Sequence, residues 1–551
     1  MRHTGFVISA AILATVLGTA RAEVVPSKVS DTSTQRADDG GYFKPESTAS
    51  KGTVSVEGSR IDYDAVAGTL VVHPKGWDDA APPPDKDSKV SVEASGSNEG
   101  NANPTAEASI FYVAYFRHGV DVAKRPVTFV FNGGPGSATV WLHMGAFGPR
   151  RVVTADDSHT PAAPYQVVNN DYSLLDASDL VFVDAPGTGF SRIAGKDKEK
   201  AFYGVDPDAH AFAEFVSGFL SKYGRWNSPK YVFGESYGTP RAAILVKLLE
   251  TDYSVDFNGV IMLSQILNFD LSVDEPQANP GIDLPYMLAL PTYAATAWYH
   301  HKLPGTAAPD LETFLSTVET FAMNDYASAL ARGSELGEEQ RHAIAQKLHE
   351  YTGLPVSYIL KADLRINGGE FGKTLQNDDD ITTGRLDTRF SGPSMDPLSK
   401  EAAYDPQSAA ISSAYVSAFN DYVRKVLNYG QDKTYRPSAG LWRSWDFRHQ
   451  QPGSDRPSSG AANTMPDLAM AMKYNPGLKI LLTGGYFDLA TPFYEGWYEM
   501  HHLPIPARLQ DNIQYRYYQS GHMVYAHQAS LQQVHDDVAT FINATDNLEQ
   551  N

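Results

Sequence analysis

The chain has 551 residues, of which 42% are hydrophobic and 20% charged, and its formal net charge is −20. This length suffices for a large hydrophobic core with an insertion. The negative charge makes nucleic acids and anionic membranes poor partners. The chain has no cysteine, which excludes disulfides, thiol catalysis and cysteine metal sites.

Residues 1–22 have the pattern of a secretory signal peptide. A basic start is followed by an apolar run at 6–17 that is short for a membrane span, and Ala20-Arg21-Ala22 is typical of a cleavage site. An uncleaved anchor is the alternative. No later apolar run reaches the length of a spanning helix. We therefore expect an exported protein, periplasmic or secreted, whose mature chain is soluble and has no membrane span.

Strand and helix patterns alternate over residues 53–272. The polar segment 23–52 is expected to be a flexible lead, and the Pro/Asp/Ser-rich segment 75–107 a long loop. A hairpin is predicted at 53–72, strands at 110–116, 127–131, 180–183, 231–233 and 260–263, and helices at 211–223 and 242–249. Such alternation predicts an α/β fold, with a mostly parallel sheet between helices.

The pattern becomes mainly helical over residues 273–445, with predicted helices at 311–331, 335–352 and 409–427. Strand and helix patterns return over 446–551. The sequence thus predicts an α/β core in two parts, 53–272 and 446–551, separated by a helical insertion that forms a cap.

The segment Gly234-Glu235-Ser236-Tyr237-Gly238 lies between an apolar strand pattern and a helical pattern. A Gly-x-Ser-x-Gly turn in this context is typical of a nucleophile elbow, which exposes the serine hydroxyl at the tip of the turn. Serine is a weak nucleophile by itself, so this interpretation requires a base, an orienting acid and an oxyanion hole elsewhere in the chain.

The C-terminal part contains a candidate acid and a candidate base. Asp488 follows the apolar strand pattern at 478–482, and His522 follows the strand pattern at 515–518. Taken alone, a loop aspartate could equally cap a turn, and a lone histidine is more often structural. The chain order Ser236, Asp488, His522 is the order found in α/β-hydrolases. We therefore predict that these three residues form a catalytic triad.

The oxyanion of an acyl-transfer intermediate needs two N–H donors. The backbone N–H of Tyr237, directly after the nucleophile, is one candidate. The other is expected in the turn at Gly133-Gly134, where the lack of Cβ atoms lets the backbone approach a substrate. The alternative is a tight turn with no chemical role.

Five motifs together resemble the serine carboxypeptidases: Asn132 to Gly136 (NGGPG), Gly148-Pro149, Asp184 to Ser191 (DAPGTGFS), GESYG and Gly521-His522-Met523. The resemblance runs from about residue 127 to the end of the chain, with a diverged insertion. It implies an exopeptidase that acts on peptides with a free C-terminus. It also implies the triad Ser236, Asp488 and His522, with Gly134 and Tyr237 as oxyanion donors.

The resemblance further implies a site for the substrate's terminal carboxylate, with Asn132, Gly133 and Glu235 as binding groups. Glu235 can hold a carboxylate only when it is protonated, because two carboxylates at hydrogen-bond distance cannot both ionise. We therefore expect better peptidase activity at acidic pH. The alternative role for Glu235 is a support of the elbow.

The sequence departs from the family pattern at four positions, Val130, Ser137, Ala146 and Tyr486. Ala146 replaces a second glutamate, which weakens the carboxylate site. An esterase or acyltransferase with the same triad therefore stays as an alternative. An aminopeptidase resembling proline iminopeptidases, which also carry a Gly-Gly-x-Gly turn, and a non-catalytic binding protein with a hydrolase fold are further alternatives.

No cofactor or metal is expected. The adjacent pairs His300-His301 and His501-His502 lack ligand spacing, and Asp378 to Asp380 fits a solvated loop.

Overall fold

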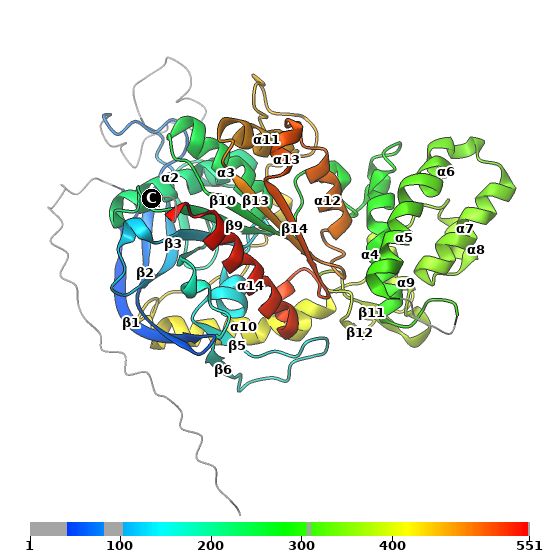
Figure 1. Cartoon of the computed structure of the whole chain (residues 1–551), viewed down its shortest axis with the longest axis horizontal. Helices are drawn as coiled ribbons and strands as arrows, with labels where there is room; N and C mark the ends of the chain where they lie inside the picture. Colours follow the sequence, from blue (N-terminus) through cyan, green and yellow to red (C-terminus); the bar gives the residue numbers. More distant parts are fainter. Residues whose placement is uncertain (1–40, 82–102, 306–309, 549–551) are drawn as a thin grey trace, which may run out of the picture.

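The computed structural model of the protein describes residues 41–81, 103–305 and 310–548 (Figure 1). The predicted signal peptide at 1–22 and most of the predicted loop at 75–107 lie outside these residues. Within them, no helix combines the length and the apolar character that a membrane crossing requires.

Ten strands of the described part form one sheet, in the spatial order β1-β2-β3-β7-β4-β9-β10-β13-β14, with β8 paired to β3. From β7 to β14 all neighbours are parallel, whereas β1, β2, β3 and β7 pair in antiparallel fashion. The strands are β1 (Ser47–Val56), β2 (Ser59–Val72), β3 (Glu107–Arg117), β4 (Val127–Phe131), β7 (Asp179–Val183), β8 (Arg192–Ala194), β9 (Lys230–Glu235), β10 (Gly259–Leu263), β13 (Lys479–Gly485) and β14 (Ile513–Tyr518).

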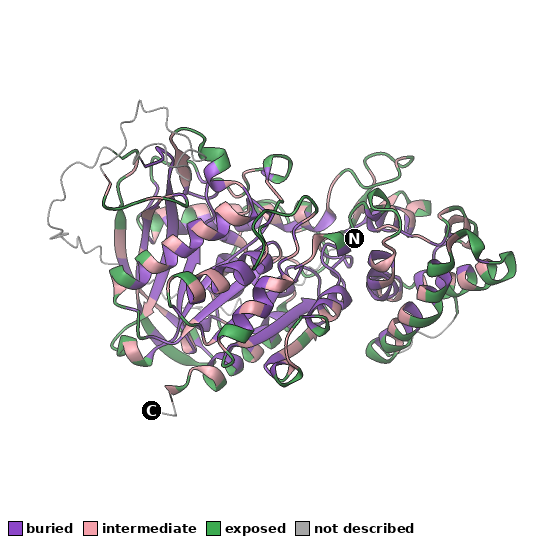
Figure 2. Ribbon diagram, turned by 90° about the horizontal axis from the view of Figure 1, so that it is seen from above, coloured by how far each residue is buried: buried purple, intermediate pink, exposed green. Residues whose placement is uncertain are grey.

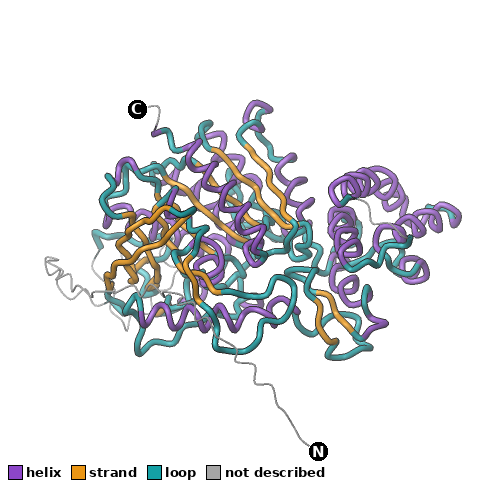
Figure 3. Tube along the Cα trace, turned by 60° about the horizontal axis from the view of Figure 1, so that its bottom comes forward, coloured by secondary structure: helices purple, strands orange, loops and turns teal. Residues whose placement is uncertain are grey.

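Helices cover both faces of this sheet (Figures 1 and 3). The central strands are buried along their whole length, as their continuous apolar runs predict. Successive side chains of β4 enter different cores: Phe129 and Phe131 pack with helices α2, α3 and α11, whereas Val130 packs with α10 and α14. The sheet order and the two helical layers confirm the predicted α/β class with a mostly parallel sheet.

The helices of the two layers begin and end as follows: α1 (Lys198–Phe202), α2 (Val205–Tyr223), α3 (Gly238–Asp252), α10 (Pro406–Lys425), α11 (Met465–Tyr474), α12 (Phe493–His501), α13 (Ala507–Gln510) and α14 (Gln528–Thr545). One turn of π-helix, Leu142–Phe147, lies beneath the sheet in the core that contains α10 and α14. Short hairpins pair β5 (Arg150–Val152) with β6 (Val167–Asn169) and β11 (Ile381–Thr383) with β12 (Ser391–Pro393).

A separate group of helices stands at one end of the molecule (Figure 1). It comprises α4 (Leu284–Tyr299), α5 (Leu311–Phe321), α6 (Ala327–Arg332), α7 (Glu338–Thr352), α8 (Val356–Lys361) and α9 (Gly368–Thr374). These helices share a hydrophobic core with Phe487, Phe493 and Tyr494 of the sheet side. Figure 2 shows the strands of the sheet mainly as buried, whereas the helices of this group have many exposed residues. In α7, for example, the buried residues are only Ala345, Leu348, Tyr351 and Thr352.

The segment predicted as one helical insertion, 273–445, divides in the structure. Its last helix, α10, packs beneath the sheet through Ile411, Tyr415 and Phe419, apart from α4–α9. The following chain returns to the glycine turns of the core, because Ser438 bridges to Ser137 and Arg436 to Gly189. Helical periodicity alone could not distinguish a helix of the core from a helix of the cap.

The amino-terminal hairpin is confirmed, but its first strand starts earlier than predicted. β1 begins at Ser47, inside the segment predicted as a flexible lead, and pairs with β2 along its whole length. Glu57 and Gly58 form the turn, and both have positive φ. Residues Ser47 to Lys51 are small or polar, so their strand is stabilised by pairing that local sequence does not reveal.

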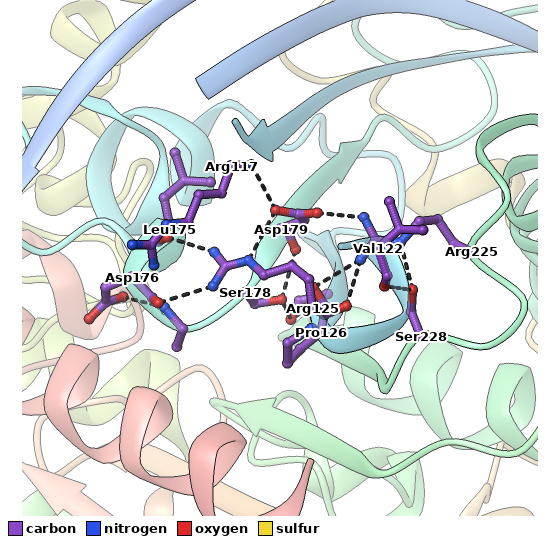
Figure 4. A network of polar contacts seen from close by, with 12 residues as sticks. Arg117, Val122, Arg125, Pro126, Leu175, Asp176, Ser178, Asp179, Arg225 and Ser228 are labelled. Carbon is purple, nitrogen blue, oxygen red and sulfur yellow. Dashed lines mark hydrogen bonds and ion pairs between the residues drawn. The ribbon is translucent and has the colours of Figure 1, made fainter. Parts of the chain in front are cut away.

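A buried polar network holds the amino ends of the central strands together (Figure 4). Asp179 begins β7 and pairs with Arg225 and, at 3.2 Å, with Nε of Arg125, just before β4. Arg225 also donates to the carbonyl of Arg125 at 2.7 Å and to Ser228 Oγ at 2.7 Å. This network lies at the opposite end of the strands from the carboxyl ends, where α/β folds place their ligands.

Candidate active site

Ser236 stands on a strained turn between β9 and α3. Its φ is +60°, a left-handed conformation that is uncommon for residues other than glycine. The backbone holds this turn: Ser236 N–H donates to the carbonyl of Leu263 at 2.9 Å, and Thr239 N–H donates to the Ser236 carbonyl at 2.8 Å. Glycine is required at 234, since a Cβ there would lie 2.2 Å from the Gly238 carbonyl oxygen. The geometry is that of a nucleophile elbow.

Asp488 and His522 form a buried hydrogen-bonded pair at the ends of β13 and β14. The Nδ1 of His522 lies 2.8 Å from Oδ2 of Asp488. The carboxylate is oriented by N–H donors of Ala490 and Thr491 at 2.9 and 3.0 Å, and by the Thr491 hydroxyl at 2.7 Å. Burial by itself lowers the pKa of His522, but the charge and hydrogen bond of Asp488 raise it above its ordinary value.

A cavity of about 490 Å³ brings most of the predicted site residues together. Ser236, His522 and the segment Asn132 to Gly134 line it, with Glu235 and Tyr237. Asp488 does not line the cavity but lies behind His522, which is where an orienting acid belongs. The eight residues predicted from sequence thus converge at the carboxyl ends of neighbouring parallel strands.

The glycine turn after β4 lies directly against the elbow. A Cβ on Gly133 would approach the Tyr237 nitrogen to 2.3 Å and the Glu235 carbonyl oxygen to 2.7 Å. Gly134 has φ +110°, a conformation that side chains disfavour. This turn therefore lies close to the backbone of Tyr237, and both line the same cavity. Two N–H groups that bind one oxyanion require such proximity.

Glu235 is buried beside the triad, with 3% of its surface exposed. Burial raises the pKa of its carboxyl to about 7, although the charge of His522 and a hydrogen bond from Tyr525 oppose this rise. The Tyr525 hydroxyl donates to Oε2 at 2.8 Å. The side chain of Asn132, next to Glu235, accepts from the N–H of Leu142 at 3.2 Å.

Arg241 ties the elbow helix to the glycine turn. It is fully buried in α3, pairs with the buried carboxylate of Asp208 at 2.6 Å and donates to the carbonyl of Asn132 at 2.8 Å. The pair of Arg241 and Asp208 was not predicted from the sequence. An arginine inside an apolar helical pattern, five residues after Ser236, was the available signal, because a buried charge requires a partner.

Two further groups of cavity residues were not predicted. Arg385 and Leu386, from the loop after β11, reach the cavity, and Leu386 accepts the His522 N–H at 2.6 Å. Thr491 approaches His522 Nδ1 at 3.2 Å. The remaining walls combine serines and Asp274 with apolar side chains, which are Trp141, Ile266, Phe269, Ile411, Trp442, Ala490 and Met523. The sequence carries a signal only for Thr491, an Asp-x-x-Thr spacing that suits a capped turn.

Ala146 lies in the π-helical turn and is buried. Its carbonyl accepts from Asn170 at 2.7 Å, and the residue does not line the cavity. Among the residues that the structure describes, no group of three or more histidine and carboxylate side chains could hold a metal ion.

Comparison with known proteins supports the resemblance over part of the chain. The family model described as serine carboxypeptidase matches residues 94–273. A serine carboxypeptidase, ctsa-3.2, of Caenorhabditis elegans is 26% identical over 186 residues, covering 32% of this chain and 34% of its own. A carboxypeptidase Y homolog of Arthroderma benhamiae is 30% identical over 137 residues, covering 25% of each chain. The alignments thus span about a third or less of these two relatives.

Among solved structures, a proline iminopeptidase of Mycobacterium smegmatis is 13% identical with a TM-score of 0.35, covering 80% of this chain and 96% of its own. The fold itself is evident from the chain: a mostly parallel sheet, helices on both faces, and Ser236, Asp488 and His522 in this order after β9, β13 and β14. This is the α/β-hydrolase fold.

Proposed function

We propose that the protein is a serine carboxypeptidase that removes residues from peptide C-termini through an acyl-enzyme. One observation carries the proposal: Ser236 and the hydrogen-bonded pair of His522 and Asp488 meet at one cavity, with the glycine turn against the elbow. The match of residues 94–273 to the serine carboxypeptidase family supports the choice of substrate class.

In the proposed mechanism, Ser236 Oγ attacks the scissile carbonyl while Nε2 of His522 accepts its proton. The oxyanion binds the N–H groups of Gly134 and Tyr237. His522 then gives the proton to the leaving amine, the C–N bond breaks, and an acyl ester remains on Ser236. A water molecule attacks this ester by the same route and releases the shortened peptide. Asp488 holds the imidazole tautomer and stabilises the imidazolium.

The substrate's terminal carboxylate is proposed to bind Asn132, Gly133 and Glu235. A neutral Glu235 can donate a hydrogen bond to this carboxylate, whereas an ionised one repels it. Since burial raises the pKa of Glu235 to about 7, the carboxyl is largely protonated at acidic pH. Hydrolysis of free-acid peptides should therefore be favoured below neutrality.

The deciding experiment follows a panel of peptides by mass spectrometry. We expect stepwise loss of C-terminal residues, and slower loss from the same peptides when they are amidated. Loss from the amino end would reject the proposal in favour of an aminopeptidase. Turnover of simple esters without any loss from peptides would establish an esterase or acyltransferase, the alternative that Ala146 in place of a second glutamate favours.

Export is proposed from the sequence pattern of residues 1–22. Cleavage after Ala22 predicts a mature chain that begins at Glu23. Amino-terminal sequencing of the protein from its producing cells tests this prediction. An intact Met1 in a cytoplasmic fraction would contradict it.

A further inference from the structure

The carboxyl of Glu235 has a buried partner that does not touch the cavity. Tyr525 lies three residues after His522, is 3% exposed, and donates its hydroxyl hydrogen to Glu235 Oε2 at 2.8 Å. We propose that Tyr525 is a positioning residue of the substrate-carboxylate site, which orients Glu235 and sets the pH range in which free-acid peptides are accepted. The inference rests on the proposed function and assigns a new residue to it.

The Tyr525 ring is held rigidly against the π-helical turn. A Cβ on Gly145 would lie 2.8 Å from Cδ2 of Tyr525 and 2.6 Å from the hydroxyl oxygen of Tyr415. Both rings therefore pack against the backbone of Gly145, which has no side chain and directly precedes Ala146. Tyr525 also belongs to the short helix Val524–Ala526, which follows the histidine loop. This packing keeps its hydroxyl in place beside Glu235.

The hydrogen bond decides which oxygen of Glu235 carries the proton. Burial raises the pKa of Tyr525 well above its ordinary value, so the phenol stays protonated and donates. With Oε2 accepting from Tyr525, the proton of a neutral Glu235 is directed to Oε1. That oxygen can then donate to a substrate carboxylate.

The same hydrogen bond favours the ionised form of Glu235. The other titratable groups facing this carboxyl are His522, which also favours ionisation, and Asp488, which opposes it. The hydroxyl of Tyr415 lies near it too, with Arg151 close to that hydroxyl. Loss of the Tyr525 hydroxyl should therefore keep Glu235 protonated to a higher pH.

The test compares two substrates so that the titration of His522 cancels. An N-acylated dipeptide with a free C-terminus requires both a neutral His522 and a protonated Glu235. The alkyl ester of the same N-acyl amino acid requires only the neutral His522. The ratio of their kcat/KM values, measured from pH 4.5 to 9.5, therefore reports the protonation of Glu235 alone.

In the wild type we expect this ratio to fall with rising pH, with a midpoint near the Glu235 pKa of about 7. In Tyr525→Phe the midpoint should rise by about one pH unit, the equivalent of one hydrogen bond to a charged group. At acidic pH the ratio should also drop about fivefold, because the carboxyl is less well oriented. Tyr415→Phe removes the other hydroxyl near Glu235 but leaves the hydrogen bond from Tyr525 in place, so its ratio should keep the wild-type midpoint.

Four outcomes would contradict these expectations and are distinguishable. Superimposed ratios for the wild type and Tyr525→Phe would overturn this inference alone. A wild-type ratio that does not change with pH would remove Glu235 from carboxylate binding, and the inference with it. Absence of free-acid hydrolysis at every pH would reject the proposed function. A merely structural defect in Tyr525→Phe would lower turnover of both substrates equally and leave the midpoint unchanged, which also overturns the inference.

Discussion

Ser236 adopts a conformation that its neighbours impose. A serine in the left-handed region costs on the order of 1 kcal/mol or more, and it persists only where the surrounding structure determines it. Here Leu263 holds the backbone from the adjacent strand, and Gly234 and Gly238 remove the side chains that would collide. This turn places Ser236 on the wall of the cavity that His522 also lines.

The first prediction concerns this hydroxyl. A fluorophosphonate should label Ser236 covalently, and Ser236→Ala should abolish labelling and lower kcat by several powers of ten, about 10³-fold or more. Ser412 lines the same cavity from α10 and serves as the control. Ser412→Ala should retain labelling. Labelling that survives Ser236→Ala would show that another residue is the nucleophile.

At the scale of elements, the candidate active site depends on how closely two turns approach each other. The turn after β4 and the turn after β9 belong to neighbouring parallel strands, so their carboxyl ends meet at one edge of the sheet. Gly133 permits this contact, because any side chain there would press into the backbone of Tyr237. Arg241 and Asp208 reinforce the contact from behind.

The second prediction tests the approach of these turns. Gly133→Ala should displace the proposed oxyanion donors, Gly134 and Tyr237, and lower kcat by about 10²-fold or more, comparable with the loss of one donor. Labelling by the fluorophosphonate should slow in parallel. Gly337→Ala is the control, since a Cβ at Gly337 has no neighbour within 4 Å and its φ of −61° suits alanine. Unchanged kcat in Gly133→Ala would exclude this turn from the oxyanion site.

A second contact between elements depends on pH. His449 is buried, with Nδ1 2.5 Å from Asp206 in α2 and Nε2 2.7 Å from Asp467 in α11. Lys247 of α3 also pairs with Asp467, at 3.4 Å. Burial alone lowers the pKa of His449, but its two carboxylate partners raise it to about 9. A charged histidine thus links two helices of one layer.

The third prediction follows from this raised pKa. The charged His449 stabilises the fold fully below its unfolded-state pKa of about 6.5. This stabilisation is lost as the pH rises through the folded-state pKa of about 9. We expect His449→Gln to be less stable than the wild type at pH 6, and the difference in unfolding free energy between the two proteins to narrow by on the order of 3 kcal/mol by pH 10. Urea unfolding at several pH values measures this gap. His118→Gln, at an exposed pair with Asp64, is the control. A gap independent of pH would contradict the assignment.

At the scale of the whole molecule, the two ends of the sheet carry different kinds of residues. The carboxyl ends carry the site residues, whereas the amino ends carry the buried network of Asp179, Arg125 and Arg225 (Figure 4). The helices α4–α9 stand apart and reach the sheet side through α12 and its neighbouring aromatic residues. Arg385 and Leu386, after β11, extend from that side to the cavity wall.

The fourth prediction concerns the network at the amino ends. Asp179→Asn should destabilise the fold by about 3–5 kcal/mol, because it leaves two buried guanidinium groups without their counter-charge. The kcat of the folded fraction should stay unchanged, since the network is remote from the cavity. Asp62→Asn, at an exposed pair with Arg60, should have little effect. A large loss of kcat without loss of stability would show that the two ends are coupled.

Much of the candidate site could be predicted because each residue follows a recognisable local pattern. Ser236, Asp488 and His522 each follow a strand pattern, and residues at the ends of parallel strands share one edge of the sheet. Tyr525 and Arg385 had no such signal. Tyr525 acquires its role only through Glu235, which is distant in sequence, and Arg385 only because the fold brings it to the cavity.

The sequence by itself therefore determined the α/β class, the central strands and the order of the site residues, since local apolar periodicity and glycine turns specify these features. Only the tertiary structure decided that α10 belongs to the core, that β1 begins at Ser47, and that Tyr525 holds Glu235. The physical reason is the same in all three cases. Pairing, burial and hydrogen bonding join segments that are far apart along the chain, and their energies do not appear in any short stretch of residues.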